Sequence, residues 1–262
     1  MVAIDVDGTL LRSDKRLSRR NIEAIARAVE QGVRIVLATA RPPRSMRELY
    51  DILQPDPLQI NYNGALIFDR ASRANLYHRP LSLDMTRQVV EFARQLDPEV
   101  IVSLEVLDKW YTDRVHLSLH TETSRSFGPD MVAPLEEILR TAVTKLMLLA
   151  PPAQLVPVHA QIRAAFGSDL AIAVSDEHLI QITHPSVDKG NALALLAEHY
   201  GLAREQVMAI GDAPNDQGML RWAGLGVAMD NAWPSLRDAA DVVVPSNDQD
   251  GVAAALERFV LK

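Results

Sequence analysis

The sequence contains no cysteine among its 262 residues. This absence excludes disulfide frameworks, thiolate metal sites and cysteine nucleophiles, and it favours a reducing compartment. Long apolar runs are also missing, since no stretch approaches the roughly 18–20 residues that span a bilayer. The first residues, Met1 to Asp5, include an acidic side chain and no basic region, so they do not resemble a signal peptide. We therefore expect a cytoplasmic protein without a membrane anchor.

Basic residues are fewer than acidic ones: 27 lysines and arginines stand against 34 aspartates and glutamates, a formal net charge of −7. Without a basic stripe, nucleic acid and membranes are not expected as partners. A phosphorylated ligand would be repelled at long range, so any phosphate site must be a local arrangement of donors or a cation. The content of 48% hydrophobic and 23% charged residues is that of a globular protein. No motif indicates oligomerisation, so a monomer is the default expectation.

Strand and helix signals alternate in the first and last parts of the chain. Short apolar runs are predicted as strands, and apolar residues at helical spacing as helices. The N-terminal part has predicted helices between Ser18 and Gly32 and over 43–53, and predicted strands over 2–6, 33–38, 58–60 and 65–68. The C-terminal part has predicted strands over 207–210, 224–229 and 242–244, and predicted helices over 189–200, before Gly224, before Val242 and at the chain end. This order is typical of an α/β fold, so we expect a doubly wound, Rossmann-like parallel sheet.

The middle of the chain has a different pattern. Hairpins are predicted for 100–106 with 109–112 and for 170–174 with 178–182; helices are predicted over 85–96, 134–142 and 153–166, and a strand over 144–149. This order indicates a small α+β domain with a mainly antiparallel sheet. The extended dipeptides Arg79-Pro80 and His184-Pro185 are the candidate boundaries. We therefore expect a core formed by 1–80 and 185–262, with an α+β cap domain, 81–184, inserted into it.

Polar residues follow the predicted strands of the core. The first strand leads into Asp5-Val6-Asp7-Gly8-Thr9, the second into Thr39-Ala40-Arg41-Pro42, and the strand over 207–210 into the acidic loop 211–216. Lys189 opens a predicted helix, where an ammonium group and the helix dipole both favour a phosphate. Each pattern alone is commonly a cap, a turn or a solvated side chain. Together they matter more, because ligands of doubly wound sheets bind beyond the carboxyl ends of the strands.

These segments resemble the motifs of the haloacid dehalogenase superfamily. Asp5-Val6-Asp7-Gly8-Thr9-Leu10 is similar to the first motif, Lys189-Gly190 to the third and Gly211-Asp212-Ala213-Pro214-Asn215-Asp216 to the fourth. The large insertion, Asn63-Gly64-Ala65 and Ala228-Met229-Asp230-Asn231-Ala232 resemble the Cof-type sugar-phosphatase branch. One departure is Ala40, where the second motif usually has glycine. The resemblance covers essentially the whole chain.

The resemblance implies a role for each matching residue. Asp5 would attack phosphorus to form an aspartyl-phosphate, and Asp7 would act as general acid and then general base. Mg²⁺ would be held by Asp5, by the backbone carbonyl of Asp7 and by Asp212. The phosphate would be bound by Thr39, Ala40 and Lys189, with Asn215 contacting the phosphate or orienting Lys189. Asp216, Arg41 and Asn63 are further candidates for supporting roles.

The implied activity is a Mg²⁺-dependent phosphatase acting on small phosphorylated metabolites such as sugar phosphates, with the inserted domain as a lid. Two alternatives remain open from the sequence. A phosphotransferase or phosphomutase would use the same aspartate but retain the phosphoryl group. A phospho-accepting switch or a silent metabolite-binding protein is the other, although Asp7 argues against it because a switch needs no general base there.

Other residues carry weaker signals. His116 and His120 have the i, i+4 spacing of a metal pair, but no carboxylate motif accompanies them, so contact with substrate is the better functional interpretation. Trp222 and Trp233 are predicted to be packing residues. Arg41 and Arg44 follow Thr39, and contact with a leaving group and a solvated position are equally compatible with the pattern.

Overall fold

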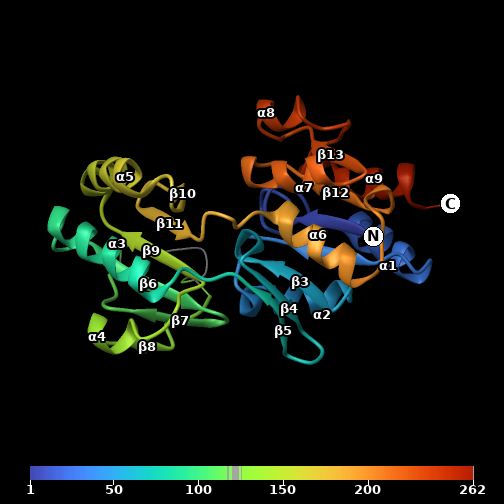
Figure 1. The fold of residues 1–262 in the computed structure, drawn as a ribbon. Coiled ribbons are helices and arrows are strands. Elements are labelled where there is room, and N and C mark those ends of the chain that lie inside the picture. Colours follow the sequence, from blue (N-terminus) through green and yellow to red (C-terminus); the bar gives the residue numbers. More distant parts are fainter. Residues whose placement is uncertain (117, 120–123, 125, 262) are drawn as a thin grey trace. The chain divides into compact units, whose positions relative to one another are not determined.

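The computed structural model describes residues 1–116, 118–119, 124 and 126–261, and the chain forms two compact units (Figure 1). Met1–Tyr77 and Asp188–Lys262 make up one, here called the core unit. His78–Val187 make up the other, here called the inserted unit. The division lies within a few residues of the dipeptides Arg79-Pro80 and His184-Pro185.

The core unit is built on an eight-stranded sheet with the order β14-β13-β12-β1-β2-β3-β4-β5. The strands are β1 (Val2–Asp5), β2 (Ile35–Ala38), β3 (Leu58–Asn61), β4 (Leu66–Asp69), β5 (Asn75–His78), β12 (Met208–Gly211), β13 (Leu225–Met229) and β14 (Val242–Val244). The strands from β14 to β3 pair in parallel, whereas β4 runs antiparallel to β3. The expected doubly wound parallel sheet is therefore confirmed, and it is extended by the antiparallel strand β4 and by β5, a strand not predicted from the sequence.

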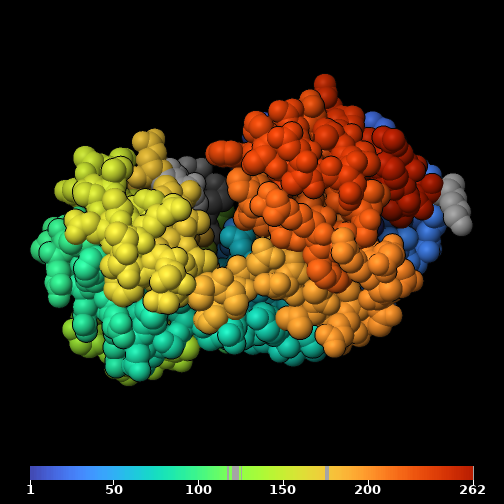
Figure 2. Space-filling view, turned by 45° about the horizontal axis from the view of Figure 1, so that its top comes forward, coloured from blue at the N-terminus to red at the C-terminus, as the bar shows by residue number. Residues whose placement is uncertain are grey.

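Helices cover both faces of this sheet. The right-handed crossovers from β1 to β3 place α1 (Arg19–Glu30) and α2 (Arg47–Leu53) on one face, where α9 (Gly251–Phe259) packs against α1. The chain runs outward in the opposite direction from β12 to β14, so α7 (Gln217–Trp222) and α8 (Pro234–Arg237) lie on the other face, where α6 (Lys189–His199) packs on α7. The segment from α6 onward, coloured from amber to red, forms a continuous surface of the core unit in Figure 2. With both faces covered, β1, β2, β3 and β12 are buried along their whole length.

The inserted unit contains a six-stranded sheet with the order β10-β11-β9-β6-β7-β8. Its strands are β6 (Ile101–Val106), β7 (Lys109–Thr112), β8 (Met131–Val132), β9 (Lys145–Leu149), β10 (Ala171–Asp176) and β11 (Leu179–Thr183), and its helices are α3 (Leu83–Leu96), α4 (Leu135–Ile138) and α5 (Pro152–Phe166). All strand pairs are antiparallel except β7 with β8. Helices α3 and α5 pack on one another over a shared apolar core. The helix expected over 134–142 is shorter than predicted, because Leu139 leaves the helical conformation with φ −95° and ψ 69°.

The order of the core strands determines where a ligand can bind. β1 and β12 are neighbours, yet the chain proceeds from β1 toward β3 and from β12 toward β14, in opposite directions across the sheet. Such a reversal opens a crevice at the carboxyl ends of the two strands. Asp5 ends β1 and Gly211 ends β12, so the first and fourth motifs meet there. In the described part of the chain, no helix has the length and apolar character needed to cross a membrane.

Candidate active site

The turn after β1 and the loop after β12 are packed directly against each other. Gly8 adopts φ +86°, and a Cβ atom on it would lie 2.3 Å from Oδ2 of Asp212. The Thr9 hydroxyl donates a hydrogen bond to Oδ1 of Asp212 at 2.7 Å. Glycine is therefore required here both for its conformation and for the close approach of the Asp212 carboxylate.

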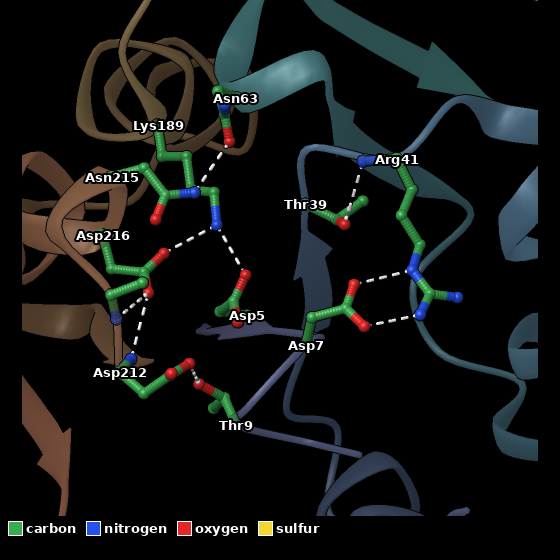
Figure 3. A network of polar contacts seen from close by, with 11 residues as sticks. Asp5, Asp7, Thr9, Thr39, Arg41, Asn63, Lys189, Asp212, Asn215 and Asp216 are labelled. Carbon is green, nitrogen blue, oxygen red and sulfur yellow. Dashed lines mark hydrogen bonds and ion pairs between the residues drawn. The ribbon is translucent and has the colours of Figure 1, made fainter. Parts of the chain in front are cut away.

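Asp5 is a buried carboxylate with two differently placed oxygens. Oδ1 accepts a hydrogen bond from Nζ of Lys189 at 2.6 Å, whereas Oδ2 is buried without a hydrogen-bond partner among the described residues (Figure 3). Burial raises the pKa of Asp5 well above its usual range; the charges of Asp216 and Asp212 add to the rise, and Lys189 opposes it. A buried oxygen without a donor is unfavourable unless a ligand completes it. The free oxygen therefore marks a position for a cation or for an electrophile.

Lys189 connects Asp5 to the loop that follows β12. It is the first residue of α6 and fully buried, and its Nζ donates to Oδ1 of Asp5 and to Oδ1 of Asp216 at 2.6 Å each. Burial alone would lower the pKa of Lys189, but the two carboxylates outweigh it and raise that pKa. Oδ2 of Asp216 accepts hydrogen bonds from the backbone amides of Asp212 and Ala213 at 3.0 Å each. Asp216 therefore fixes both the ammonium group and the acidic loop.

The acidic side chains at this point fit a divalent cation. Asp5, Asp212 and Asp216 each place a carboxylate oxygen within 4.8 Å of the others. Burial raises the pKa of Asp212 to about 6. The hydrogen bond from Thr9 lowers this pKa, and the charge of Asp216 raises it further. Both oxygens of Asp216 are bound to protein donors, which leaves Asp5 and Asp212 as the better side-chain ligands. Hard cations such as Mg²⁺ prefer oxygen ligands, and carboxylate oxygens surround the Asp5 oxygen that has no hydrogen-bond donor among the residues that the structure describes.

Asp7 turns away from this acidic group. β1 ends at Asp5, so strand alternation does not set the direction of Asp7, and Figure 3 shows its carboxylate facing Arg41. Nε of Arg41 donates to Oδ2 at 2.7 Å and Nη2 to Oδ1 at 2.6 Å, while Nζ of Lys15 lies 2.8 Å from Oδ1. Burial alone would raise the pKa of Asp7, but Arg41 and then Lys15 outweigh it and lower that pKa. The Asp7 side chain is not in the acidic group, so only its backbone could serve as a metal ligand here.

The loop after β2 is held by the end of β3. Thr39 is buried, and its hydroxyl accepts a hydrogen bond from the backbone amide of Arg41 at 3.1 Å, with the half-buried Ala40 between them. The Asn61 side chain donates to the carbonyl of Arg41 at 3.0 Å, and the Asn63 amide donates to the carbonyl of Thr39 at 2.9 Å. Sequence reasoning missed Asn61, although it too is a polar residue at the carboxyl end of a parallel strand, the signal that identified the others.

Left-handed backbone follows β3. Tyr62 and Asn63 have φ values of 52° and 57°, and Tyr62 is buried despite this strained conformation. The Asn215 side chain donates to Oδ1 of Asn63 at 2.9 Å, so this turn is bound to the loop of Asp212 and Asp216. The hydrogen-bond partner that the structure gives the Asn215 side chain is therefore Asn63, and its expected roles at the phosphate or at Lys189 stay predictions.

Three further expectations are corrected or limited by the structure. Trp233 is 61% exposed, so its prediction as a packing residue is wrong, whereas the half-buried Trp222 packs against the core. Trp233 precedes Pro234 at the start of α8, where helix periodicity does not direct its side chain. Arg44 is buried, which excludes the solvated alternative for it. His116 is exposed and its ring contacts Ser118, while His120 lies outside the described residues.

Comparison with known proteins gives concordant matches. Residues 2–256 match the family of haloacid dehalogenase-like hydrolases. Two proteins of Bacillus subtilis, both named 5-amino-6-(5-phospho-D-ribitylamino)uracil phosphatase, are similar over nearly their whole length: YitU is 28% identical over 99% of this chain and 97% of its own, and YcsE is 30% identical over 100% and 96%. The crystal structure of a haloacid dehalogenase-like hydrolase from Bacteroides thetaiotaomicron superposes with a TM-score of 0.88 at 29% identity, covering 98% of each chain.

Proposed function

Because the chain belongs to the haloacid dehalogenase-like hydrolases and is a phosphatase of that family, we propose that it hydrolyses small phosphorylated metabolites through an aspartyl-phosphate on Asp5, with Mg²⁺ as its cofactor. The observation that carries the proposal is the state of the Asp5 carboxylate. One oxygen is held by Lys189 and the other is buried without a protein donor, as a nucleophile directed at an incoming phosphorus requires. The roles that we propose for the other site residues are set by the position of this oxygen.

In the first step, Oδ2 of Asp5 forms a bond to phosphorus while the bond from phosphorus to the leaving-group oxygen breaks. The leaving oxygen takes a proton from the Asp7 carboxyl, which must first loosen its ion pair with Arg41 and Lys15. In the second step, Asp7 takes a proton from a water molecule as that water attacks phosphorus. The bond between phosphorus and Oδ2 of Asp5 breaks. Inorganic phosphate is released, and the free Asp5 carboxylate and the protonated Asp7 carboxyl are restored.

Lys189, Thr39 and the backbone at Ala40 are the phosphate-binding groups in this proposal. Lys189 is buried and oriented by Asp216, so it is preorganised to meet charge on the phosphoryl oxygens. The Mg²⁺ ligands would be the side chains of Asp5 and Asp212 and the backbone carbonyl of Asp7. When bound, the ion supplies positive charge against the nucleophile and the phosphoryl oxygens.

We assign recognition of the part of the leaving group remote from the ester oxygen to the inserted unit, in the role of a cap. The two Bacillus subtilis relatives are named for a ribityl phosphate ester, which is a phosphomonoester of a polyhydroxylated chain. Sugar phosphates and this ester are therefore the first compounds to test.

The test is release of inorganic phosphate from a panel of phosphomonoesters, with and without Mg²⁺. We expect metal-dependent release by the wild type and background release by Asp5→Asn, because the amide is a poor nucleophile. Asp14→Asn is the matched control, since Asp14 is an aspartate whose side chain is 55% exposed in the turn beyond the motif. The wild type could instead release no phosphate while Mg²⁺ and a phosphate mimic still raise its melting temperature. That result would overturn the proposal of hydrolysis and favour phosphoryl transfer or binding.

A further inference from the structure

Lys15 is a cation beside the proposed general acid that the motifs do not include. It lies in the turn after β1 with φ +65°, and the turn is closed by hydrogen bonds from the Lys15 amide to the Arg12 carbonyl at 2.9 Å and from the Arg12 amide to the Arg16 carbonyl at 3.0 Å. Its Nζ lies 2.8 Å from Oδ1 of Asp7. The backbone thus places this ammonium group at the Asp7 carboxylate.

Lys15 and Arg41 share one carboxylate but are held differently. Oδ1 of Asp7 accepts from both cations, and Oδ2 accepts from Arg41 alone among the contacts described here. The Arg41 side chain is 18% exposed and makes two hydrogen bonds to Asp7, whereas the Lys15 side chain is 53% exposed and makes one. An exposed ion pair of this kind contributes little to stability, so Lys15 can exchange its partner at small cost.

We propose that Lys15, with Arg41 beside it, selects phosphate esters whose leaving group carries a second anion, a carboxylate or phosphate, close to the ester oxygen. This inference rests on the proposed function: if Asp7 gives its proton to the leaving oxygen, that oxygen lies against the Asp7 carboxyl. Atoms one or two bonds further along the leaving group then come within reach of the Lys15 ammonium.

An anion is the group that competes for these cations. A hydroxyl has no net charge to set against the Asp7 carboxylate, so it would leave Lys15 on Asp7. A carboxylate attracts the ammonium group as a full opposite charge and can replace Asp7 as its acceptor. With a net charge of −7, the chain as a whole does not attract anions, so their selection requires local cations such as these.

The experiment compares 2-phosphoglycolate with its amide, 2-phosphoglycolamide, which has the same shape but lacks the carboxylate charge. The measured quantity is the ratio of kcat/KM for the acid to kcat/KM for the amide, in the wild type and in Lys15→Gln. We expect this ratio to fall about tenfold in the variant, which corresponds to about 1.4 kcal/mol, with the change mainly in KM for the acid. Taking the ratio within each protein cancels the intrinsic reactivity of the two esters.

Two further variants separate selection from structural damage. Lys15→Arg keeps the charge and should restore most of the ratio, and Arg16→Gln changes a cation whose side chain is 83% exposed next to it and should leave the ratio unchanged. The inference is overturned if Lys15→Gln turns over both esters with the wild-type ratio, or if Lys15→Arg loses the ratio as completely as Lys15→Gln. Failure of the wild type to hydrolyse any phosphomonoester would instead overturn the proposed function, so the two failures are distinguishable.

Discussion

Gly8 is the residue at which the backbone and the candidate site depend on each other most directly. In Gly8→Ala, the new methyl group would lie 2.3 Å from Oδ2 and 2.8 Å from Cγ of Asp212, at a φ of +86°. We expect the Asp212 carboxylate to be displaced, with phosphate release falling at least about tenfold because a metal ligand moves. The left-handed conformation itself should cost about 1–2 kcal/mol of unfolding free energy.

Gly32→Ala is the matched control for this prediction. Gly32 also has a left-handed conformation, with φ +77°, but a Cβ atom there meets nothing within 4 Å. Its alanine variant should lose similar stability and keep its phosphate release and its Mg²⁺ dependence. Equal losses of activity in both variants would show that strain, and not the contact with Asp212, is responsible.

Single residues also show what the sequence can predict about the site. Asp5 and Asp212 were proposed as site residues because they lie at the carboxyl ends of core strands, and Lys189 was proposed because it opens a helix. The contact between Lys15 and Asp7 was not, because it depends on how the turn after β1 folds back. The bond between Asp216 and Lys189 was not predicted either, because it joins residues that are 27 apart in sequence and meet only through packing; Asp216 was expected only in a supporting role.

At the scale of elements, Asp56 joins β2, β3 and the end of α6 at the edge of the sheet opposite the candidate site. Its buried carboxylate accepts hydrogen bonds from the Tyr200 hydroxyl at 2.5 Å, the Leu58 amide at 3.0 Å and Nη1 of Arg34 at 3.0 Å. Tyr200→Phe removes one donor from a buried charge, so we expect the free energy of unfolding to fall by about 1.5–3 kcal/mol. Urea unfolding measures this change, and phosphate release should stay at its wild-type rate.

Tyr77→Phe provides the comparison for this prediction. Tyr77 is a half-buried tyrosine of the same unit, and the described residues include no hydrogen-bond partner for its hydroxyl. Its variant should unfold at nearly the wild-type urea concentration. The proposed contribution of Asp56 would be refuted by a Tyr200→Phe protein as stable as Tyr77→Phe.

Elements at the edges were the ones that the sequence predicted poorly. The central strands were predicted because continuous apolar runs mark strands buried on both faces, as in β1 and β2. β5 has two exposed residues followed by two half-buried ones, and β8 has only two residues, so neither shows a burial pattern that sequence reasoning can detect. Such strands form because a neighbouring strand offers backbone partners, and that information lies outside their own residues.

At the scale of the whole molecule, His78 is a junction residue: it is the last residue of β5 in the core sheet and the first residue of the inserted unit. Nε2 of His78 lies 2.9 Å from the hydroxyl of the buried Thr144, which also accepts a hydrogen bond from the Leu107 amide at 2.7 Å. Burial lowers the pKa of His78. The folded unit therefore binds this proton less readily than the unfolded chain does, where the pKa is about 6.5.

Stability falls with decreasing pH wherever the unfolded state binds more protons than the folded state. We therefore expect the inserted unit to lose stability as the pH falls below about 6.5. Above that pH, His78 should make no contribution to the pH dependence of stability. His78→Gln removes the titrating group, so its unfolding free energy should depend less on pH between 7 and 5 than that of the wild type. His116→Gln changes an exposed histidine of the same unit and should keep the wild-type dependence. Urea unfolding at a series of pH values, followed by the fluorescence of Trp110 in Trp222→Phe/Trp233→Phe backgrounds, reports on the inserted unit alone. Parallel stability curves for wild type and His78→Gln would mean that His78 carries no burial penalty, and that the pH response of this unit comes from other groups, such as His184, whose pKa is also lowered by burial.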